Sequence, residues 1–221
     1  MLDRGSPPAF NEISEFHLIQ PTSHKLGNGV PIHIINIAHQ PVIKLELIIP
    51  AGQWYEPDAG ISFFALKMLS EGTEQRSAKN ISNHFDKYGA FLELNPGLDH
   101  IAITLYTLSK YLNELIPVLA EIIYQPTFPA SELETLLEVK RQKVKVDQEK
   151  SSYVASRKFR ELLFGVSHPY GAYLQEKHLD TIGRESLIKY HKQYIPGLFE
   201  IIISGNLEPS SISVIEKYFG K

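Results

Sequence analysis

The pattern of apolar positions predicts a buried helix over residues 59–73. Apolar side chains cover almost every face of that helix: Ile61, Phe63, Phe64, Ala65, Leu66, Met68 and Leu69. A helix that is apolar all round is normally buried in a protein core. We expect Asp58 to cap its start and Gly72 to end it in the left-handed conformation. The one charge in its middle belongs to Lys67, and the residue type alone favours a buried stem with an amine that reaches water.

Alternation of apolar and polar positions predicts six strands, and their order indicates one mostly antiparallel sheet. The alternation is clearest in residues 42–49 and 100–107. Asn28-Gly29 is a strong turn signal, so the strands on either side of it are expected to form a hairpin. The predicted strands cover residues 16–20, 31–37, 42–49, 90–95, 100–107 and 199–205.

Apolar positions at helical spacing predict six further helices. Ser77 is the expected N-cap of the first, and Ser131 with Glu134 has the spacing of a capping box at the start of the third. The mixed charges of that third helix are interpreted as a solvated face. The helices are expected over residues 77–88, 109–124, 131–150, 151–164, 184–194 and 208–219.

The element order, with strands first and helices clustered later, is typical of an α+β fold in one domain, residues 1–221. Residues 1–14 are expected to form an extended polar arm. A net charge of −3 without a basic tract argues against nucleic-acid binding, and the absence of cysteine excludes disulfides and thiol catalysis. No apolar run is long enough for membrane insertion. Residues 1–10 lack the apolar core of a signal peptide, so we expect a cytoplasmic protein, or a periplasmic one if a signal was trimmed.

Residue types alone identify no active site. Nine histidines are present, but no two of them lie three or four residues apart on one predicted helix, as a helical zinc site requires. His33 and His39 are interpreted as surface imidazoles and His168 as a turn residue. Ser204 ends a strand without an assignable base, and the carboxylate pairs lie on the solvated helix.

Five sequence blocks in order along nearly the whole chain point further. They are residues 26–30, 51–73, 85–90, 164–171, and the pair 194–196 and 201–207. The second block contains Gly60, Met68, Gly72 and Thr73, and it is similar to the pattern Gly-x-x-His-x-x-Glu-His-Met-x-x-x-Gly-Thr. Together the blocks resemble the insulinase/pitrilysin-type zinc peptidases, the family of the mitochondrial processing peptidase. The resemblance implies a metallopeptidase-like α+β sandwich, with a mostly antiparallel mixed sheet and helices packed on one face. It also implies that the chain is the first domain of a two-domain half.

The family's zinc-binding and catalytic residues do not carry over onto this chain. The resemblance places Phe63 at the first zinc histidine, Leu66 at the general-base glutamate and Lys67 at the second zinc histidine. A phenyl ring offers a metal no lone pair, leucine accepts no proton, and an ammonium repels a dication. We therefore expect no catalytic residue and no metal or cofactor in this chain, with zinc only in a partner subunit.

The third zinc ligand of the family, a glutamate, falls near Val144 in this chain. The nearest glutamates, Glu138 and Glu149, are several residues away on either side. Apolar side chains at the first two positions are expected to fill the volume that the site once held. For Lys67 we formulate the hypothesis that its amine sits where a cation used to be and pairs with a carboxylate.

The resemblance implies a non-catalytic domain that pairs with an active His-x-x-Glu-His subunit, and that encloses and positions peptide substrates. Two alternatives stay open. One is an active zinc-dependent endopeptidase whose ligands come from elsewhere, and the other is an assembly module like the core subunits of the respiratory bc1 complex. Active members bind substrate as an added strand at a sheet edge. The corresponding edge strand here is expected to consist of Phe91, Leu92, Glu93, Leu94 and Asn95.

Overall fold

A mixed six-stranded sheet organises the part of the chain that the structure describes. The structure is a computed structural model that describes residues 5, 18–37 and 41–221. The strand order is β1-β2-β6-β3-β5-β4, in which β2 and β6 pair in parallel and every other neighbouring pair is antiparallel. The strands are β1 (Thr22–Lys25), β2 (Pro31–Asn36), β3 (Val42–Ile49), β4 (Phe91–Asn95), β5 (Ile101–Leu108) and β6 (Glu200–Gly205). The mostly antiparallel mixed sheet of the predicted α+β fold is thus confirmed.

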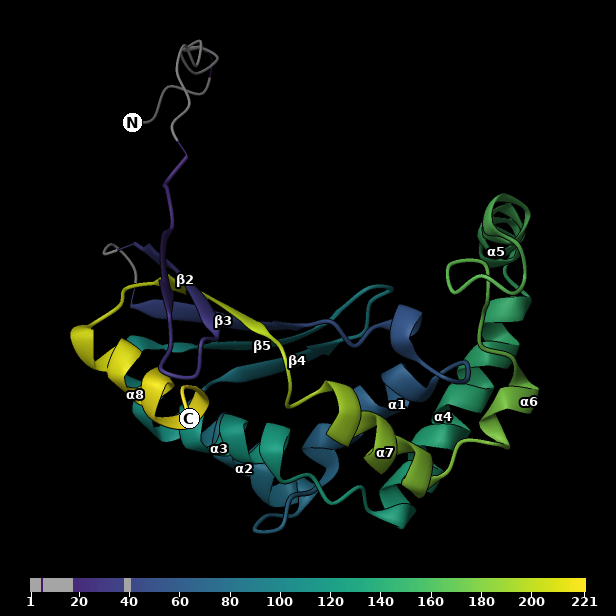
Figure 1. Ribbon diagram of the computed structural model, residues 1–221. Helices are drawn as coiled ribbons and strands as arrows, with labels where there is room; N and C mark the ends of the chain where they lie inside the picture. The colour runs from purple at the N-terminus through teal and green to yellow at the C-terminus, as the bar shows by residue number, and fades with distance from the viewer. Residues whose placement is uncertain (1–4, 6–17, 38–40) are drawn as a thin grey trace.

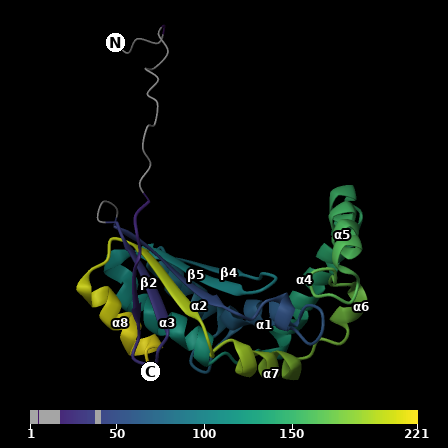
Figure 2. The ribbon, with the colours of Figure 1, turned by 45° about the horizontal axis from the view of Figure 1, so that its top comes forward.

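Helices cover one face of this sheet, as predicted. In Figure 1, α2, α3 and α8 lie beneath the strands, with α1 and α7 beside them. The turned view in Figure 2 shows the same layering, with α4 and α6 at one end and α5 standing clear of the rest. The helices are α1 (Ile61–Lys67), α2 (Ala78–Lys87), α3 (Leu112–Tyr124), α4 (Ala130–Gln148), α5 (Ser151–Phe164), α6 (Glu176–Leu179), α7 (Arg184–Tyr194) and α8 (Pro209–Phe219). Among the described residues, no helix is long and apolar enough to cross a bilayer.

The alternation along β3 explains why only one face is covered. Four of its six aliphatic side chains, at positions 43, 45, 47 and 49, are fully buried on the helix side. Burying one such side chain contributes about 1.5–3 kcal/mol. Lys44 and Glu46 project from the opposite face, where their side chains form an ion pair of 3.1 Å. On the opposite face, which carries no helix among the described residues, these charges alternate with the less buried Val42 and Ile48.

The hairpin that Asn28-Gly29 predicts is confirmed, and it is fastened to the far end of the chain. β1 and β2 pair around it, and Gly29 has φ of +89°. The Asn28 amide donates to the carbonyl oxygens of Phe219 (2.9 Å) and Lys221 (3.0 Å). The first hairpin and α8 are thereby held together.

Some predicted boundaries are wrong. Residues 18–20 of the first predicted strand are irregular, and β1 begins at Thr22. The capping box at Ser131 is not formed, because α4 begins one residue earlier with Pro129 as its N-cap. Helix α6 was not predicted, since four residues are too short for an apolar period to appear. The expectations for residues 1–14 and for His39 lie outside the described residues, apart from Gly5.

Candidate functional site

Helix α1 starts in a way that the sequence did not suggest. Gly60, its N-cap, has φ of +99°, and a Cβ there would lie 2.8 Å from the Leu174 side chain, so only glycine fits. The cap comes from Glu56 and not from Asp58, which corrects the prediction. The Glu56 carboxylate accepts from the backbone N–H groups of Gly60 and Ser62, both at 3.1 Å, and from the Ser62 hydroxyl at 2.8 Å. Burial raises the pKa of Glu56, and these hydrogen bonds act in the opposite direction.

The predicted helix 59–73 ends earlier than expected. α1 stops at Lys67, a 3-10 turn (Met68–Glu71) follows, and Gly72 has φ of +154° and ψ of 145°, which is not the left-handed helical conformation. The next residue, Thr73, donates its hydroxyl proton to the buried carboxylate of Glu121 on α3. Arg76 forms an ion pair with the same carboxylate. The Gly-Thr block thus anchors the end of this segment to α3.

The three positions that the resemblance aligns with zinc chemistry differ in burial. Leu66 is fully buried in the core, while Phe63 and Lys67 are half-buried. The Phe63 ring meets that of Phe64 edge-on, with centroids 5.1 Å apart. The Lys67 ammonium donates to the carbonyl oxygen of Leu94 on β4 at 2.5 Å. The site is therefore packed with carbon on one side and carries a cation on the other.

Lys67 does not form the hypothesised direct ion pair with a carboxylate. Its direct acceptor is a backbone carbonyl, and no ion pair within 4 Å is found for it among the described residues. Burial lowers the pKa of Lys67, and the negative charge of Glu93 partly opposes that shift from a longer distance.

A second lysine, Lys140, lies beside Phe63, although the charge pattern of its helix predicts a solvated position for it. Lys140 on α4 places its ammonium 3.7 Å from the centroid of the Phe63 ring. Burial, followed by the charge of Lys143, lowers the pKa of Lys140, and the charge of Lys67 acts in the same direction. The spacing holds a signal for this contact. Lys140 lies seven residues after Leu133 and four before Val144, which are both buried, so it belongs to the inward face of α4 and not to its solvated face.

These residues do not fit a zinc ion. Val144, the expected neighbour of the third ligand, is buried and apolar. Glu138 is turned to solvent, where it pairs with Arg141 at 3.4 Å, and Glu149 is exposed. Within the described ranges, no three His, Cys, Asp or Glu side chains are grouped so that they could hold a metal. The chemistry that this arrangement offers is that of two ammonium groups beside an aromatic ring.

An open cavity of ≈ 270 Å³ lies against this group, at the end of β4. Phe63 and Lys140 form one side of it, and the turn that follows β4 forms another. Its full lining is Gln53, Glu56, Gly60, Ser62, Phe63, Pro96, Gly97, Leu98, Lys140 and Leu174. The strand proposed as the substrate edge is outermost in the sheet, since within the described ranges β4 pairs with β5 alone. The cavity therefore lies beside Lys140 and the end of the edge strand, while Lys67 contacts the same strand without lining the cavity.

Two of the sequence blocks that resemble the family contact each other in the fold. Trp54, from the second block, packs against His168 and Tyr170 of the fourth, with ring centroids 5.5 and 5.6 Å apart. The buried Tyr190 hydroxyl donates to the carbonyl oxygen of Ala51 at 2.8 Å. The loop that leads into α1 is thus fixed by the region that follows α5 and by α7.

Comparison with known proteins identifies the family and the fold of this chain. The family model described as Insulinase (Peptidase family M16) matches residues 32–164. An uncharacterized zinc protease, YmxG, from Bacillus subtilis is 27% identical over 198 residues, which cover 87% of this chain and 48% of the relative. Subunit 2 of the cytochrome b-c1 complex from Schizosaccharomyces pombe is 30% identical over 179 residues, covering 80% and 41%. Other relatives are subunits of mitochondrial processing peptidases.

A solved structure supports the same fold. The crystal structure of a peptidase M16 inactive domain from Pseudomonas fluorescens superposes with a TM-score of 0.83 at 21% identity, and it covers 90% of this chain and 50% of that one. The chain spans about half the length of the curated relatives named above. Since the family model covers more than half of the chain, this protein belongs to the insulinase family of peptidases, family M16.

Proposed function

We propose that this chain is a non-catalytic part of a peptidase assembly. It pairs with a homologous subunit that carries zinc and an intact His-x-x-Glu-His motif, and it forms a wall of the space that holds the peptide substrate. One feature of the sequence supports the proposal: the resemblance aligns Phe63, Leu66 and Lys67 with the ligands and base of active members, in a chain whose residues 32–164 match the family model. In this proposal residues 1–221 correspond to the first of two domains in one half.

The β4 edge supports a role in holding peptide. An edge strand presents unpaired backbone groups to which an extended peptide can add as a further strand. Phe91 and Asn95 are exposed, while Leu94 is buried. One carbonyl of β4, that of Leu94, is already bound by Lys67. A peptide on this edge would therefore find one fewer free acceptor at the end that adjoins the cavity.

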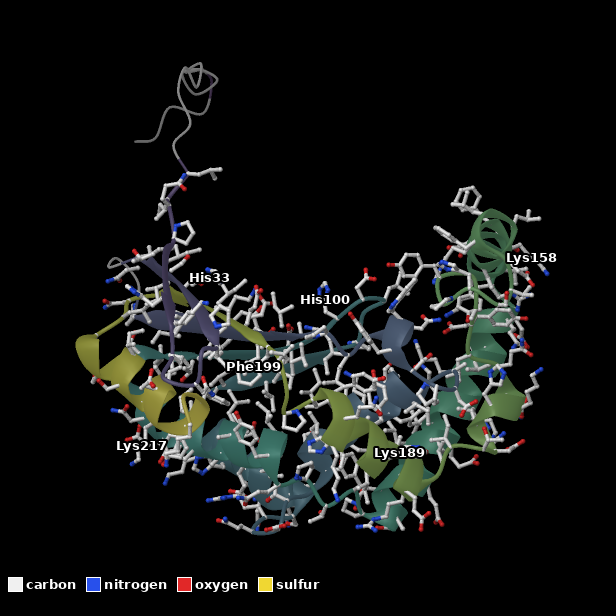
Figure 3. The ribbon with its side chains drawn as sticks, viewed as in Figure 1. His33, His100, Lys158, Lys189, Phe199 and Lys217 are labelled. Atoms are coloured by element: carbon white, nitrogen blue, oxygen red, sulfur yellow. The ribbon has the colours of Figure 1, made fainter. Side chains whose placement is uncertain are left out.

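Helix α5 supports the presence of a partner. It stands apart from the sheet in Figures 1 and 2, and none of its residues is buried. Figure 3 shows its side chains, Lys158 among them, spread around the helix and away from the rest of the molecule. Exposed apolar groups that cluster in this way are typical of interaction surfaces. The exposed apolar residues on and just after α5 are Phe159, Leu162, Leu163, Phe164 and Val166.

Reconstitution tests the proposal. The chain, a homologue with the intact motif, and the mixture of both are assayed with a quenched-fluorescence peptide library. We expect cleavage by the mixture and none by the chain alone. Leu162→Glu on the apolar face of α5 should weaken the pairing, whereas Lys189→Glu, at an exposed position on α7, should not. Cleavage and stoichiometric zinc in the chain alone would overturn the proposal in favour of an active peptidase.

A second function, as an assembly module, is favoured by the b-c1 relative alone. The two functions predict different partners for the chain in its own cells. Affinity purification of the tagged chain from its own cells should recover a homologue with the intact motif if the peptidase proposal holds. Recovery of respiratory membrane subunits instead would support the assembly module.

A further inference from the structure

Lys67 and Lys140 lie close enough for the charge of one to act on the other, near the position that the resemblance aligns with the metal of an active half, and among the described residues neither forms an ion pair with a carboxylate. Lys67 comes from α1 and Lys140 from α4, and both are half-buried. Among the described residues, no carboxylate lies within ion-pair distance of either amine. Lys67 uses one of its three N–H groups on Leu94, and Lys140 faces the Phe63 ring. N–H groups of the two ammonium groups therefore remain available to a further acceptor.

The nearby acids are committed to other partners. Asp147 lies two turns after Lys140 on the same face of α4, where its negative charge reaches Lys140 only from beyond ion-pair distance, and it pairs with Lys150 at 2.7 Å and with Lys143 at 3.8 Å. Glu93 on β4 accepts from the Asn95 amide at 3.3 Å. Glu56 caps helix α1 through three hydrogen bonds. Each of these carboxylates would have to give up an existing hydrogen bond or ion pair before it could pair with Lys67 or Lys140.

The cavity gives a ligand access to the Lys140 side chain, whereas Lys67 does not line it. The cavity is open to solvent, and Lys140, Phe63 and Ser62 line one side. The residues that follow β4, Pro96 to Leu98, line another side, so a peptide lying along the β4 edge would run directly into it. Its volume of ≈ 270 Å³ is small for a drug-sized ligand, which needs roughly 300–1,000 Å³. It has room for one side chain or one chain end.

We propose that this cavity binds a carboxylate group of a peptide, supplied either by an acidic side chain or by the C-terminus. The carboxylate contacts the Lys140 ammonium, and the carbon chain that bears it packs on Phe63 and Leu98. The inference rests on the proposed function, because it takes the ligand to be the enclosed peptide. It makes this half selective for negatively charged segments at the place where an active half would cleave.

Fluorescence anisotropy with labelled peptides tests the inference on the full 221-residue chain. The probes are short peptides of alternating Val and Thr with an amidated end and Glu, Gln or Lys at one central position. A fourth probe has Gln at the centre and a free C-terminal carboxylate. A charge-assisted hydrogen bond predicts that the Glu probe binds about tenfold more tightly than the Gln probe. If the C-terminus is the ligand, the fourth probe shows that gain instead.

Matched variants assign the effect to the cavity. Lys140→Met keeps the apolar stem and should bring the preference for a carboxylate close to unity, while Lys140→Arg should keep it. Lys143→Met, on the exposed side of the same helix, should leave it unchanged. Equal binding of all four probes, or a preference that survives in Lys140→Met, would overturn the carboxylate site and leave the proposed function standing. Failure of every probe to bind would instead contradict the peptide-holding role itself, and the inference with it.

Discussion

The burial of Leu66 leads to a quantitative prediction about the modified site. Leu66 lies where the resemblance places the general-base glutamate of active members, yet it is fully buried. A side chain facing an open catalytic cleft could be truncated at little cost. Leu66→Ala in this packed position should instead destabilise the fold by about 2–5 kcal/mol, because both transfer energy and packing are lost. At about 2–4 °C per kcal/mol for a domain of this size, the melting temperature should fall by about 4–20 °C.

Urea unfolding is a suitable assay because Trp54 is the only tryptophan of the chain. It lies in the loop before α1 and contacts His168 and Tyr170, so its fluorescence reports on this part of the fold. Leu162→Ala, at a position that is 87% exposed on α5, serves as the control and should change stability by less than about 0.5 kcal/mol. A cost below about 1 kcal/mol for Leu66→Ala would refute the argument that the site is closed by packing.

Two further predictions concern buried polar groups outside the cavity. Arg76→Met leaves the Glu121 carboxylate buried without its ion pair, so calorimetry should show that the free energy of unfolding falls by about 3–5 kcal/mol. The double variant Arg76→Met/Glu121→Leu should recover most of this loss. An additive loss in the double variant would contradict the prediction. Burial lowers the pKa of His191, whose Nε2 donates to a carbonyl oxygen at 2.7 Å. The unfolded chain then binds more protons below about pH 6.5, so stability is complete above that pH and falls as the pH drops towards the lowered pKa. His191→Gln should flatten this decline in thermal unfolding between about pH 7.5 and about pH 5.5, whereas His100→Gln, at an exposed position, should follow the parent chain.

Local patterns predicted most of the elements, because their causes are local. Alternation located β3 and β5 to within a residue, and the Asn28-Gly29 signal located the first hairpin. Ser77 caps α2 as predicted, with its hydroxyl accepting from the Asn80 N–H at 3.4 Å. In each case a few neighbouring residues determine the backbone conformation, so the sequence alone is sufficient.

The details of the candidate site depend on contacts that no local pattern contains. Glu56 caps α1 only because Gly60 turns the chain back at positive φ, which brings that carboxylate to the helix start. The mixed charges of α4 predict a solvated face for Lys140. Its position over the Phe63 ring depends instead on how α4 is placed relative to α1. Lys67 was expected to meet a carboxylate, but the sheet offered it a backbone carbonyl. That Phe63, Leu66 and Lys67 occupy the ligand positions of active members stays a prediction.

The central claim is that this chain contributes to peptide cleavage without holding the metal. The most direct test is the zinc content of each subunit after reconstitution with a homologue that carries the intact motif, measured by mass spectrometry after the two are separated. The account predicts stoichiometric zinc in the homologue and only background zinc in this chain, before and after pairing. Stoichiometric zinc in this chain, retained after dialysis against a weak chelator, would contradict it.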